Sequence, residues 1–439
     1  MAKLDGSHDG MVTQKWIKEL LTTATSNYTA LSLFSGIGGL CAGVKKAGFR
    51  VVGAVEYDKY AAVNYRLNFP EIPLYDGSVA GFLPAETPEV FEQHRQTYAN
   101  TETLDLLFGG PPCQGYSQIG PRDVADPRNE MYLEMIRLAT LLHPKFILIE
   151  NVPNMLLMKK GMFKERILNS LKSIGYSNIG LKVLNAVDFG VPQARRRVFI
   201  LATKPETLSQ NLQEIFDATA EALVEAPVSV DDAISDLPEE VTTNNTDPIL
   251  YPKCSAPTYF QREMRLDTDG DIFTKEEKAA TYKKITGKAV NGQSLYNHHT
   301  KEIQARRLAL IKLLKPGKKA DSLPKDVWDN ARPEKWRRFD GALPAHTLLA
   351  QMHRDLSEWI HPKHDRFITV REAMRLQTFP DSFVLQTSEW QQLKQIGNAV
   401  PPMLGRIPAS VIHVALAMAA SAKPMRIQKS QMSLFDATI

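Results

Sequence analysis

Cysteine is scarce in this chain, and its scarcity excludes two classes of protein. Only Cys41, Cys113 and Cys254 occur among the 439 residues. Three thiols cannot form the disulfide framework of a small secreted domain or a zinc site with four thiolates. His361 and His364 come closest to the spacing of metal ligands, but no third ligand cluster accompanies them. We therefore expect no metal site.

Long apolar runs are also missing. No segment approaches the roughly 20 apolar residues that cross a bilayer. The first residues, MAKLDGSHDGMVTQKW, lack the apolar core of a secretion signal. We expect a cytoplasmic protein without membrane contact, and the chain length suggests two or three domains.

Basic residues are absent from one stretch of the chain and concentrated in the next. Residues 205–250 contain eleven acidic residues and no Lys or Arg, whereas residues 251–339 contain twenty Lys or Arg and eleven Asp or Glu. This change indicates a separate module whose basic half follows a phosphate backbone. A solvated, lysine-rich surface explains the charge equally well.

The first half of the chain alternates short apolar runs with helical patterns. The expected strands comprise residues 30–34, 50–56, 104–108, 145–150, 181–187 and 197–203. Such alternation predicts the α/β class, with a Rossmann-like, mostly parallel sheet and helices on both faces. Ligands in such sheets bind at the carboxyl ends of the strands.

A glycine-rich turn follows the first expected strand. Its sequence, FSGIGGL, contains Gly36, Gly38 and Gly39, which allow a backbone to turn tightly and approach a ligand closely. The dinucleotide fingerprint fails, because Cys41 occupies its third glycine position. Glu56, however, ends the second strand, where it is placed to accept hydrogen bonds from a ribose. A nucleoside-bearing cofactor fits, although a plain tight turn also explains the glycines.

The stretch FGGPPCQGYS (108–117) places Cys113 directly after another strand. Pro111 and Pro112 restrict the backbone and so pre-position the sulfur. The next strand ends at Glu150, which brings a carboxylate to the neighbouring strand end. A thiol and a carboxylate beside a nucleoside cofactor form a candidate reaction centre.

Six blocks in a fixed order resemble the DNA (cytosine-5)-methyltransferases of bacterial type, which depend on S-adenosyl-L-methionine. They are FSGIGGL, GGPPCQGYS, ENV (150–152), QARRR (193–197), RFITVREAMRLQTFPDSF (366–383) and QIGNAVPP (395–402). The resemblance covers most of the chain. It departs from the family after the second helix, where YDGSV stands in place of the usual Asp-Ile pair, so that either Asp76 or Ser78 contacts the adenine.

The resemblance implies the residues that carry the chemistry. Cys113 adds to cytosine C6, Glu150 acts on the N3/N4 edge, and Arg195 and Arg197 hold the O2 side and a nearby phosphate. Because none of these groups reaches a stacked base, the cytosine is flipped out. The implied cofactor-binding residues are Phe34, Ser35, Gly36, Gly38, Gly39, Glu56, Tyr57, Ser78, Val79, Asn398, Ala399 and Val400.

The resemblance also implies the domain order. We expect a catalytic, S-adenosylmethionine-binding domain from residues 1–204 and 395–425. A smaller inserted target-recognition domain and its connecting segment occupy residues 205–394. Candidate DNA contacts are Arg262, Arg265, Arg306, Arg307 and the WRRF group (336–339), and the Asn297-His298-His299 segment is a turn or a helix cap as readily as a DNA contact.

Double-stranded DNA is the expected partner of a nucleoid-associated monomer. A restriction endonuclease encoded nearby is a further candidate partner. An RNA cytosine-5 methyltransferase of the same architecture is the alternative, although the basic insert favours duplex DNA. A non-catalytic DNA-binding protein is a second alternative, which the intact set of Cys113, Glu150 and Arg197 disfavours.

A flexible tail is expected over residues 426–439. It ends in QMSLF (431–435), which resembles the short peptides that dock bacterial replication proteins onto the sliding clamp. Met432, Leu434 and Phe435 offer apolar anchors, and Gln431 supplies orienting hydrogen bonds. In the opposing interpretation, these apolar groups pack on the protein's own domain.

Overall fold

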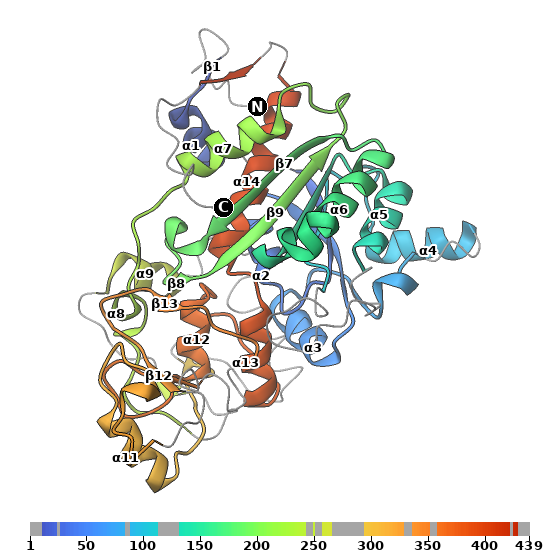
Figure 1. Cartoon of the computed structure of the whole chain (residues 1–439). Helices are drawn as coiled ribbons and strands as arrows, with labels where there is room; N and C mark the ends of the chain where they lie inside the picture. The colour runs from blue at the N-terminus through green and yellow to red at the C-terminus, as the bar shows by residue number, and fades with distance from the viewer. Residues whose placement is uncertain are drawn as a thin grey trace.

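A seven-stranded sheet forms the centre of the computed structural model (Figure 1). The residues that the structure describes are 11–23, 27–83, 88–112, 131–242, 249–250, 257–265, 294–328, 336–351, 358–421 and 425–428. In spatial order, the strands are β4 (Leu74–Asp76), β3 (Arg50–Glu56), β2 (Thr29–Leu33), β5 (Leu106–Gly109), β6 (Phe146–Asn151), β9 (Arg196–Thr203) and β7 (Asn178–Asn185).

The sheet is mostly parallel. The five strands from β4 to β6 pair in parallel, and only β9 runs antiparallel to its two neighbours, β6 and β7. The predicted α/β class and mostly parallel sheet are thereby confirmed. The carboxyl ends of β2, β3, β5 and β6 consequently meet at one edge of the sheet.

Alternation of side chains along the strands builds two apolar layers. In β5, Leu106 and Phe108 face one layer, and Leu107 faces the other. The first layer packs against α1 (Gln14–Thr23), α2 (Gly39–Lys46), α3 (Lys59–Asn68), α7 (Leu212–Ala222) and α14 (Pro402–Ala419). The second packs against α4 (Pro88–Tyr98), α5 (Met131–Leu142) and α6 (Met162–Ser173).

A second part of the molecule lies below the sheet in Figure 1 and contains little regular structure. Its helices are α8 (Val230–Ile234), α9 (Tyr259–Arg265), α11 (Ala305–Leu313), α12 (Val370–Leu376) and α13 (Glu389–Asn398). Its strands are β10 (Ile249–Leu250), β11 (Ser294–Leu295), β12 (Trp336–Arg338), β13 (Ala345–His346) and β14 (Glu358–Ile360). A small core of its own, which includes Ile311, Trp336 and Ile360, supports it.

A short parallel pair joins the second part to the sheet. Strand β13 pairs with β8 (Gln193–Ala194), which directly precedes β9. Residues 345–346 therefore lie beside the QARRR segment, although some 150 positions separate them in sequence.

The two ends of the described chain also pair with each other. Strand β1 (Met11–Val12) runs parallel to β15 (Arg426–Ile427). The tail that we expected from residue 426 therefore has its first two residues in a strand. Helix α7 likewise packs against β7 and α14, so the sheet-containing part extends beyond residue 204, where we had placed its boundary.

One helical stretch in the described part of the chain, Glu389–Ala419, is long and apolar enough to cross a membrane by length and composition. Of its most apolar window, 83% is buried inside the protein. Its second half, α14, packs against α2 and α7, as expected for a core helix.

Candidate active site

The glycine turn after β2 forms one wall of the candidate site. Gly36 and Gly38 have positive φ angles of 56° and 93°. A methyl group on Gly36 would meet nothing within 4 Å, whereas one on Gly38 would collide with the ring of Phe69. The turn therefore presents its open side at Gly36 and packs tightly at Gly38, immediately before α2 begins at Gly39.

Glu56 closes this turn from the end of β3. Its carboxylate accepts hydrogen bonds from the amides of Gly36, at 2.6 Å, and Asp58, at 2.7 Å. Burial raises the pKa of Glu56, and these amide hydrogen bonds oppose the rise. The predicted proximity of Glu56 to the glycine turn is present.

The last sequence block lies against the same turn. A methyl group on Gly39 would collide with the carbonyl oxygen of Val400 and approach Ala399. Asn398 is the exposed last residue of α13, and Ala399 follows it. Two segments some 360 residues apart in sequence thus meet.

The other predicted cofactor residues surround this wall. Phe34 is half-buried at a positive φ of 54°, and the Oγ of Ser35 lies 2.8 Å from that of Ser32. Tyr57 directly follows Glu56 and is 78% exposed. These three residues directly follow β2 and β3, at the same sheet edge as the glycine turn.

The two candidates for the adenine contact differ in their partners. The carboxylate of Asp76 forms an ion pair with Arg66 at 3.0 Å. The Oγ of Ser78 accepts a hydrogen bond from the Ala80 amide and begins the one-turn helix η1 (Val79–Gly81), in which Val79 is buried. Asp76 is therefore already engaged in an ion pair.

Glu150 is the centre of the second wall. It is the penultimate residue of β6, is almost fully buried and pairs with Arg197, whose Nε lies 2.9 Å from its Oε1. Burial raises the pKa of Glu150, although the positive charges of Arg197 and Arg195 oppose the rise. The carboxyl group therefore retains a proton to higher pH than an ordinary glutamic acid.

The segment before Cys113 runs directly past this carboxylate. A methyl group on Gly110 would lie 2.6 Å from Oε2 of Glu150. Next to Glu150, Asn151 donates a side-chain hydrogen bond to the carbonyl of Pro111 at 3.1 Å. Cys113 itself lies outside the described residues, but the two residues before it, Pro111 and Pro112, lie beside the Glu150 strand end.

The QARRR segment divides between two roles. Gln193 accepts a hydrogen bond from the Leu348 amide and donates one to the Leu376 carbonyl. Arg195 donates to the carbonyls of Leu348 and Gly397, each at 2.9 Å. Both side chains are fully buried.

This geometry separates Arg195 from Arg197. We predicted that it would hold the base or a phosphate together with Arg197, but its guanidinium joins the sheet to the second part of the molecule. Arg197 alone forms the pair with Glu150. Through these two hydrogen bonds, Arg195 fixes the backbone at Leu348 and at Gly397, which directly precedes Asn398.

Several predicted DNA contacts have other partners. Arg265 pairs with the buried Asp236 at 2.6 Å, and Arg338 pairs with Asp365. His298 and His299 are buried. The remaining candidates, Arg262 and Arg306, are exposed, whereas Arg307 and Arg337 are half-buried.

Asn297 explains the turn that precedes these histidines. It adopts a positive φ of 63°, and its side chain bonds both the amide and the carbonyl of Leu385. The Asn297-His298-His299 segment is therefore a structural turn. The buried arginines of α12, Arg371 and Arg375, are structural residues that the sequence did not reveal.

Within the part of the chain that the structure describes, no group of three His, Cys, Asp or Glu side chains could hold a metal. One sheet edge combines a glycine turn, the buried carboxylate of Glu56 bonded to that turn, and a buried Glu–Arg pair. These features lie where ligands bind in α/β folds, at the carboxyl ends of the parallel strands.

Comparison with known proteins identifies the family. The family model for C-5 cytosine-specific DNA methylases matches residues 28–413. The type II methyltransferase M.AgeI of Thalassovita gelatinovora is 31% identical, over 88% of this chain and 99% of that protein. The type II methyltransferase M.DdeI of Desulfomicrobium norvegicum is also 31% identical, over 87% of this chain and 88% of that protein.

A solved structure agrees with these relatives. It is assigned as a DNA modification methyltransferase encoded within a prophage of E. coli, with a TM-score of 0.69 and 27% identity over 89% of this chain and 100% of that one. The chain belongs to the C-5 cytosine-specific DNA methylase family and is a DNA (cytosine-5)-methyltransferase. The family description and the name of the protein in the solved structure specify DNA rather than the RNA of our alternative prediction.

The position of Arg195 yields a stability prediction. Replacing it in Arg195→Met removes both hydrogen bonds to buried carbonyls, and we expect the free energy of unfolding to fall by about 2–4 kcal/mol. Chemical denaturation monitored by tryptophan fluorescence measures the change. The matched control is Arg196→Met, because Arg196 is exposed and the substitution should cost little. Equal stability of the two variants would contradict the positioning role.

Proposed function

We propose that this enzyme methylates C5 of a flipped-out cytosine in a specific sequence of duplex DNA, through a covalent bond between Cys113 and cytosine C6. The observation that carries the proposal is the buried pair of Glu150 and Arg197. The segment leading to Cys113 lies against this pair, and the glycine turn lies on the same sheet edge.

S-adenosylmethionine fits the first wall and, when bound, supplies an electrophilic methyl group. The open side of Gly36 admits a ligand close to the backbone, and Glu56 offers its carboxylate to ribose hydroxyls. Because Asp76 is already paired with Arg66, we assign the adenine contact to Ser78 and Val79. Phe34, Ser35, Gly38, Gly39, Tyr57, Asn398, Ala399 and Val400 complete the proposed site.

Cys113 and Glu150 activate the base together. The thiolate of Cys113 forms a bond to C6, and the C5–C6 double-bond electrons move into the ring as Glu150 protonates N3. This shift makes C5 nucleophilic. Arg197 donates hydrogen bonds toward O2 and stabilises the developing charge.

The same residues restore the base. Once C5 carries the methyl group, a base removes its proton, and the released electron pair reforms the C5–C6 double bond. The Cys113–C6 bond breaks, the thiolate leaves, and the N3 proton returns to Glu150. A polarisable thiolate suits both addition and departure.

Base flipping follows from the burial of Glu150. The side chain of Glu150 is 11% exposed and that of Arg197 is 14% exposed, so neither can reach a base that remains stacked in a duplex. The cytosine must therefore leave the duplex stack to reach Glu150 and Arg197.

Methylation of plasmid DNA by the purified chain tests the proposal. After incubation with S-adenosylmethionine, bisulfite sequencing should show protected cytosines at one recurring sequence. Omission of S-adenosylmethionine is the control. Absence of protection at every cytosine, with folded protein, would overturn the proposal. The type II names of the relatives also support a cognate restriction endonuclease as a partner.

We further propose that residues 431–435 bind a bacterial sliding clamp. Gln431, Leu434 and Phe435 lie outside the described residues, so this proposal rests on their sequence. In support, β15 pairs with β1 at the end of the molecule far from α11 (Figure 1), so the segment following residue 428 starts away from the second part.

A fluorescent peptide of residues 427–439 tests this partner. We expect it to bind purified clamp at about tens of micromolar or tighter, as a short two-anchor motif should. A peptide with Leu434→Ala and Phe435→Ala is the matched control. Failure of the unmodified peptide, beside a known clamp peptide that binds, excludes the clamp.

A further inference from the structure

An exposed histidine lies where the two parts of the molecule join. In the β8–β13 pair, Ala345 opposes Gln193, and both are buried. His346 opposes Ala194, and both are exposed. Arg196, two residues beyond Ala194, is exposed as well. Neither His346 nor Arg196 has a role in the chemistry described above.

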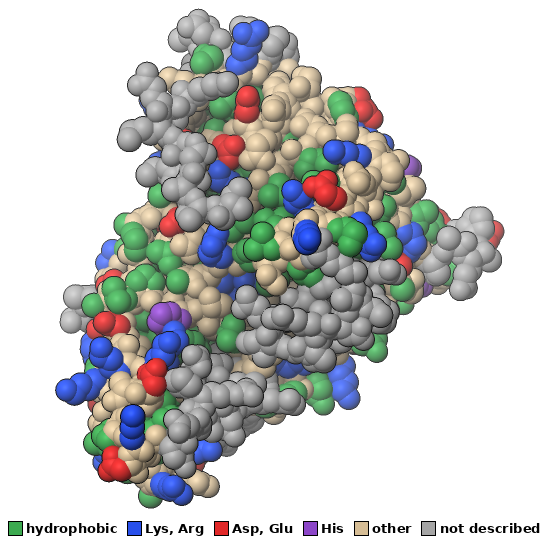
Figure 2. Space-filling view, in the orientation of Figure 1, with side chains coloured by type: hydrophobic (Ala, Val, Ile, Leu, Met, Phe, Trp, Pro, Cys, Tyr) green, Lys and Arg blue, Asp and Glu red, His purple; other side chains and the backbone are tan. Residues whose placement is uncertain are grey.

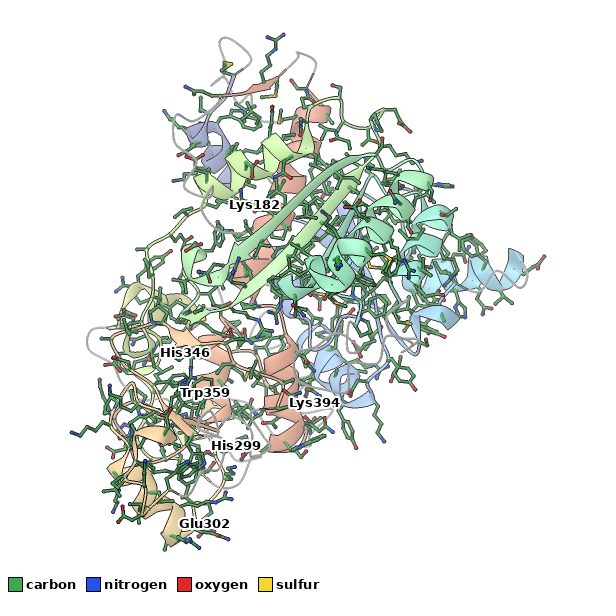
Figure 3. The ribbon with its side chains drawn as sticks, viewed as in Figure 1. Lys182, His299, Glu302, His346, Trp359 and Lys394 are labelled. Atoms are coloured by element: carbon green, nitrogen blue, oxygen red, sulfur yellow. The ribbon has the colours of Figure 1, made fainter. Side chains whose placement is uncertain are left out.

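An aromatic stack holds the imidazole of His346. Its ring lies 6.0 Å from that of Trp359 at an interplanar angle of 16°. Trp359 is buried and stacks in turn on Phe339, at 4.8 Å and 7°. Figure 3 shows Trp359 directly below His346 at the junction of the two parts. The stack already restricts this exposed side chain. His346 would therefore lose little conformational entropy on binding a ligand.

Positive charge surrounds this ring. The guanidinium of Arg337 lies 5.4 Å from the Trp359 ring centroid, and Lys319 faces Arg337 across a β-bridge. Burial, and then the charges of Arg337 and Lys319, lower the pKa of His346. Figure 2 shows a histidine with Lys and Arg side chains beside it on this face.

The positive surface begins next to the catalytic pair. Arg196 precedes Arg197, whose guanidinium both pairs with Glu150 and donates to the Arg196 carbonyl at 2.8 Å. The side chain of Arg196 is exposed, and its backbone adjoins the pair that would hold the nucleotide, so Arg196 is available to a phosphate that flanks this nucleotide. Phosphates are the anions that a duplex presents regularly at such a spacing.

We propose that Arg196, His346, Arg337 and Lys319 bind the phosphodiester backbone beside the flipped nucleotide. This set, the β8–β13 strip, contacts DNA independently of sequence and leads from the Glu150–Arg197 pair to the second part of the molecule. The inference rests on the proposed function, because it takes the cytosine to enter at Glu150. Stacking on Trp359 orients the imidazole of His346 within this strip.

Binding measurements on three variants test the strip. Arg196→Ala should weaken binding to every duplex and reduce the slope of log affinity against log salt by about 1. His346→Ala should weaken binding roughly threefold to tenfold, as loss of one hydrogen bond does. His346→Arg should restore it, because a stacked guanidinium also donates to phosphate. Fluorescence anisotropy at several salt concentrations, with cognate and unrelated duplexes, gives these values.

A matched control separates the strip from general charge. Lys15→Ala removes a cation that is 84% exposed on α1, at the other end of the molecule, and should change neither affinity nor slope. Unchanged binding by both Arg196→Ala and His346→Ala would overturn the proposal, as would loss of binding to the cognate duplex alone. Methylation by the wild-type enzyme is scored separately by bisulfite sequencing, so failure of the strip and failure of the proposed function give different results.

Discussion

DNA synthesised with 5-fluorocytosine in place of cytosine is expected to become covalently attached to the enzyme through Cys113. Addition of the thiolate and methylation of C5 proceed as with cytosine, but fluorine cannot leave as a cation in place of the proton. The C5–C6 double bond then cannot reform, and Cys113 stays attached. Complete substitution makes knowledge of the target sequence unnecessary.

The adduct is measured as labelled DNA that migrates with the protein on a denaturing gel in the presence of S-adenosylmethionine. Cys113→Ser should form none, and its turnover should fall by a factor on the order of 10³ or more, because a serine hydroxyl is a far weaker nucleophile. An adduct that persists in Cys113→Ser would show that another residue attacks.

Cys41→Ser is the matched control for this experiment. The thiol of Cys41 is fully buried and donates a hydrogen bond to Ser32 at 3.0 Å, while the Tyr65 hydroxyl donates to its sulfur. Burial raises the pKa of the Cys41 thiol, which disfavours the nucleophilic thiolate. The control should therefore form the adduct as efficiently as the wild type.

The sequence predicts six of the seven strands of the central sheet, because most of these are short apolar runs, and it misses the three-residue edge strand β4. Residues 104–108 and 145–150 match β5 and β6 closely. The direction of β9 is not predictable in this way, since no local pattern distinguishes a parallel from an antiparallel neighbour. Strand order and direction depend on contacts between segments that are distant in sequence.

The resemblance places a domain boundary at residue 204, where the acidic stretch also begins. Charge, however, describes only the exposed face of a helix. The opposite face of α7 buries Ile215 and Phe216 completely in the first apolar layer. The sheet-containing part therefore continues through α7.

Arginine is the residue type whose role the sequence predicts least well. Its chemistry suits phosphate binding, so each arginine is a candidate DNA contact. Arg195, Arg371 and Arg375 are instead fully buried. One of the two carbonyls to which Arg195 donates belongs to Gly397, 202 residues away. No local sequence pattern encodes such a partner. By contrast, Glu150 was predictable because it ends a buried strand.

Replacement of Glu150 by glutamine is expected to lower turnover by about 10²–10³. Gln has nearly the same shape as Glu and can still accept a hydrogen bond from Arg197, so binding of DNA and cofactor should change little. It cannot supply a proton to N3, so the charge that develops in the ring loses its main stabilisation. Single-turnover methylation with DNA bound in advance measures the chemical step alone.

Glu372→Gln provides the control for loss of a buried carboxylate. Glu372 is 1% exposed and pairs with Arg366 at 2.7 Å in α12, away from the glycine turn and from Glu150. Although burial alone would raise its pKa, the charge and hydrogen bonds of Arg366 lower the pKa of Glu372 to about 2. Its pair therefore stabilises the fold above the unfolded pKa, and this stability is lost as pH falls toward 2. The control should lower the free energy of unfolding at neutral pH and leave turnover per folded molecule unchanged.

The pH dependence distinguishes the role of Glu150 from a structural one. Its pKa is raised, so the protonated form that donates to N3 persists to higher pH than in an ordinary carboxyl group and is lost as pH rises through that raised pKa. Two effects of rising pH should therefore oppose each other in the wild-type single-turnover rate. Deprotonation of Glu150 lowers the rate, and ionisation of Cys113 raises it. In Glu150→Gln the decline should disappear while the rise remains, because Gln does not titrate. If Glu150→Gln loses stability but keeps the wild-type rate and both the rise and the decline of that rate with pH, another residue is the proton donor.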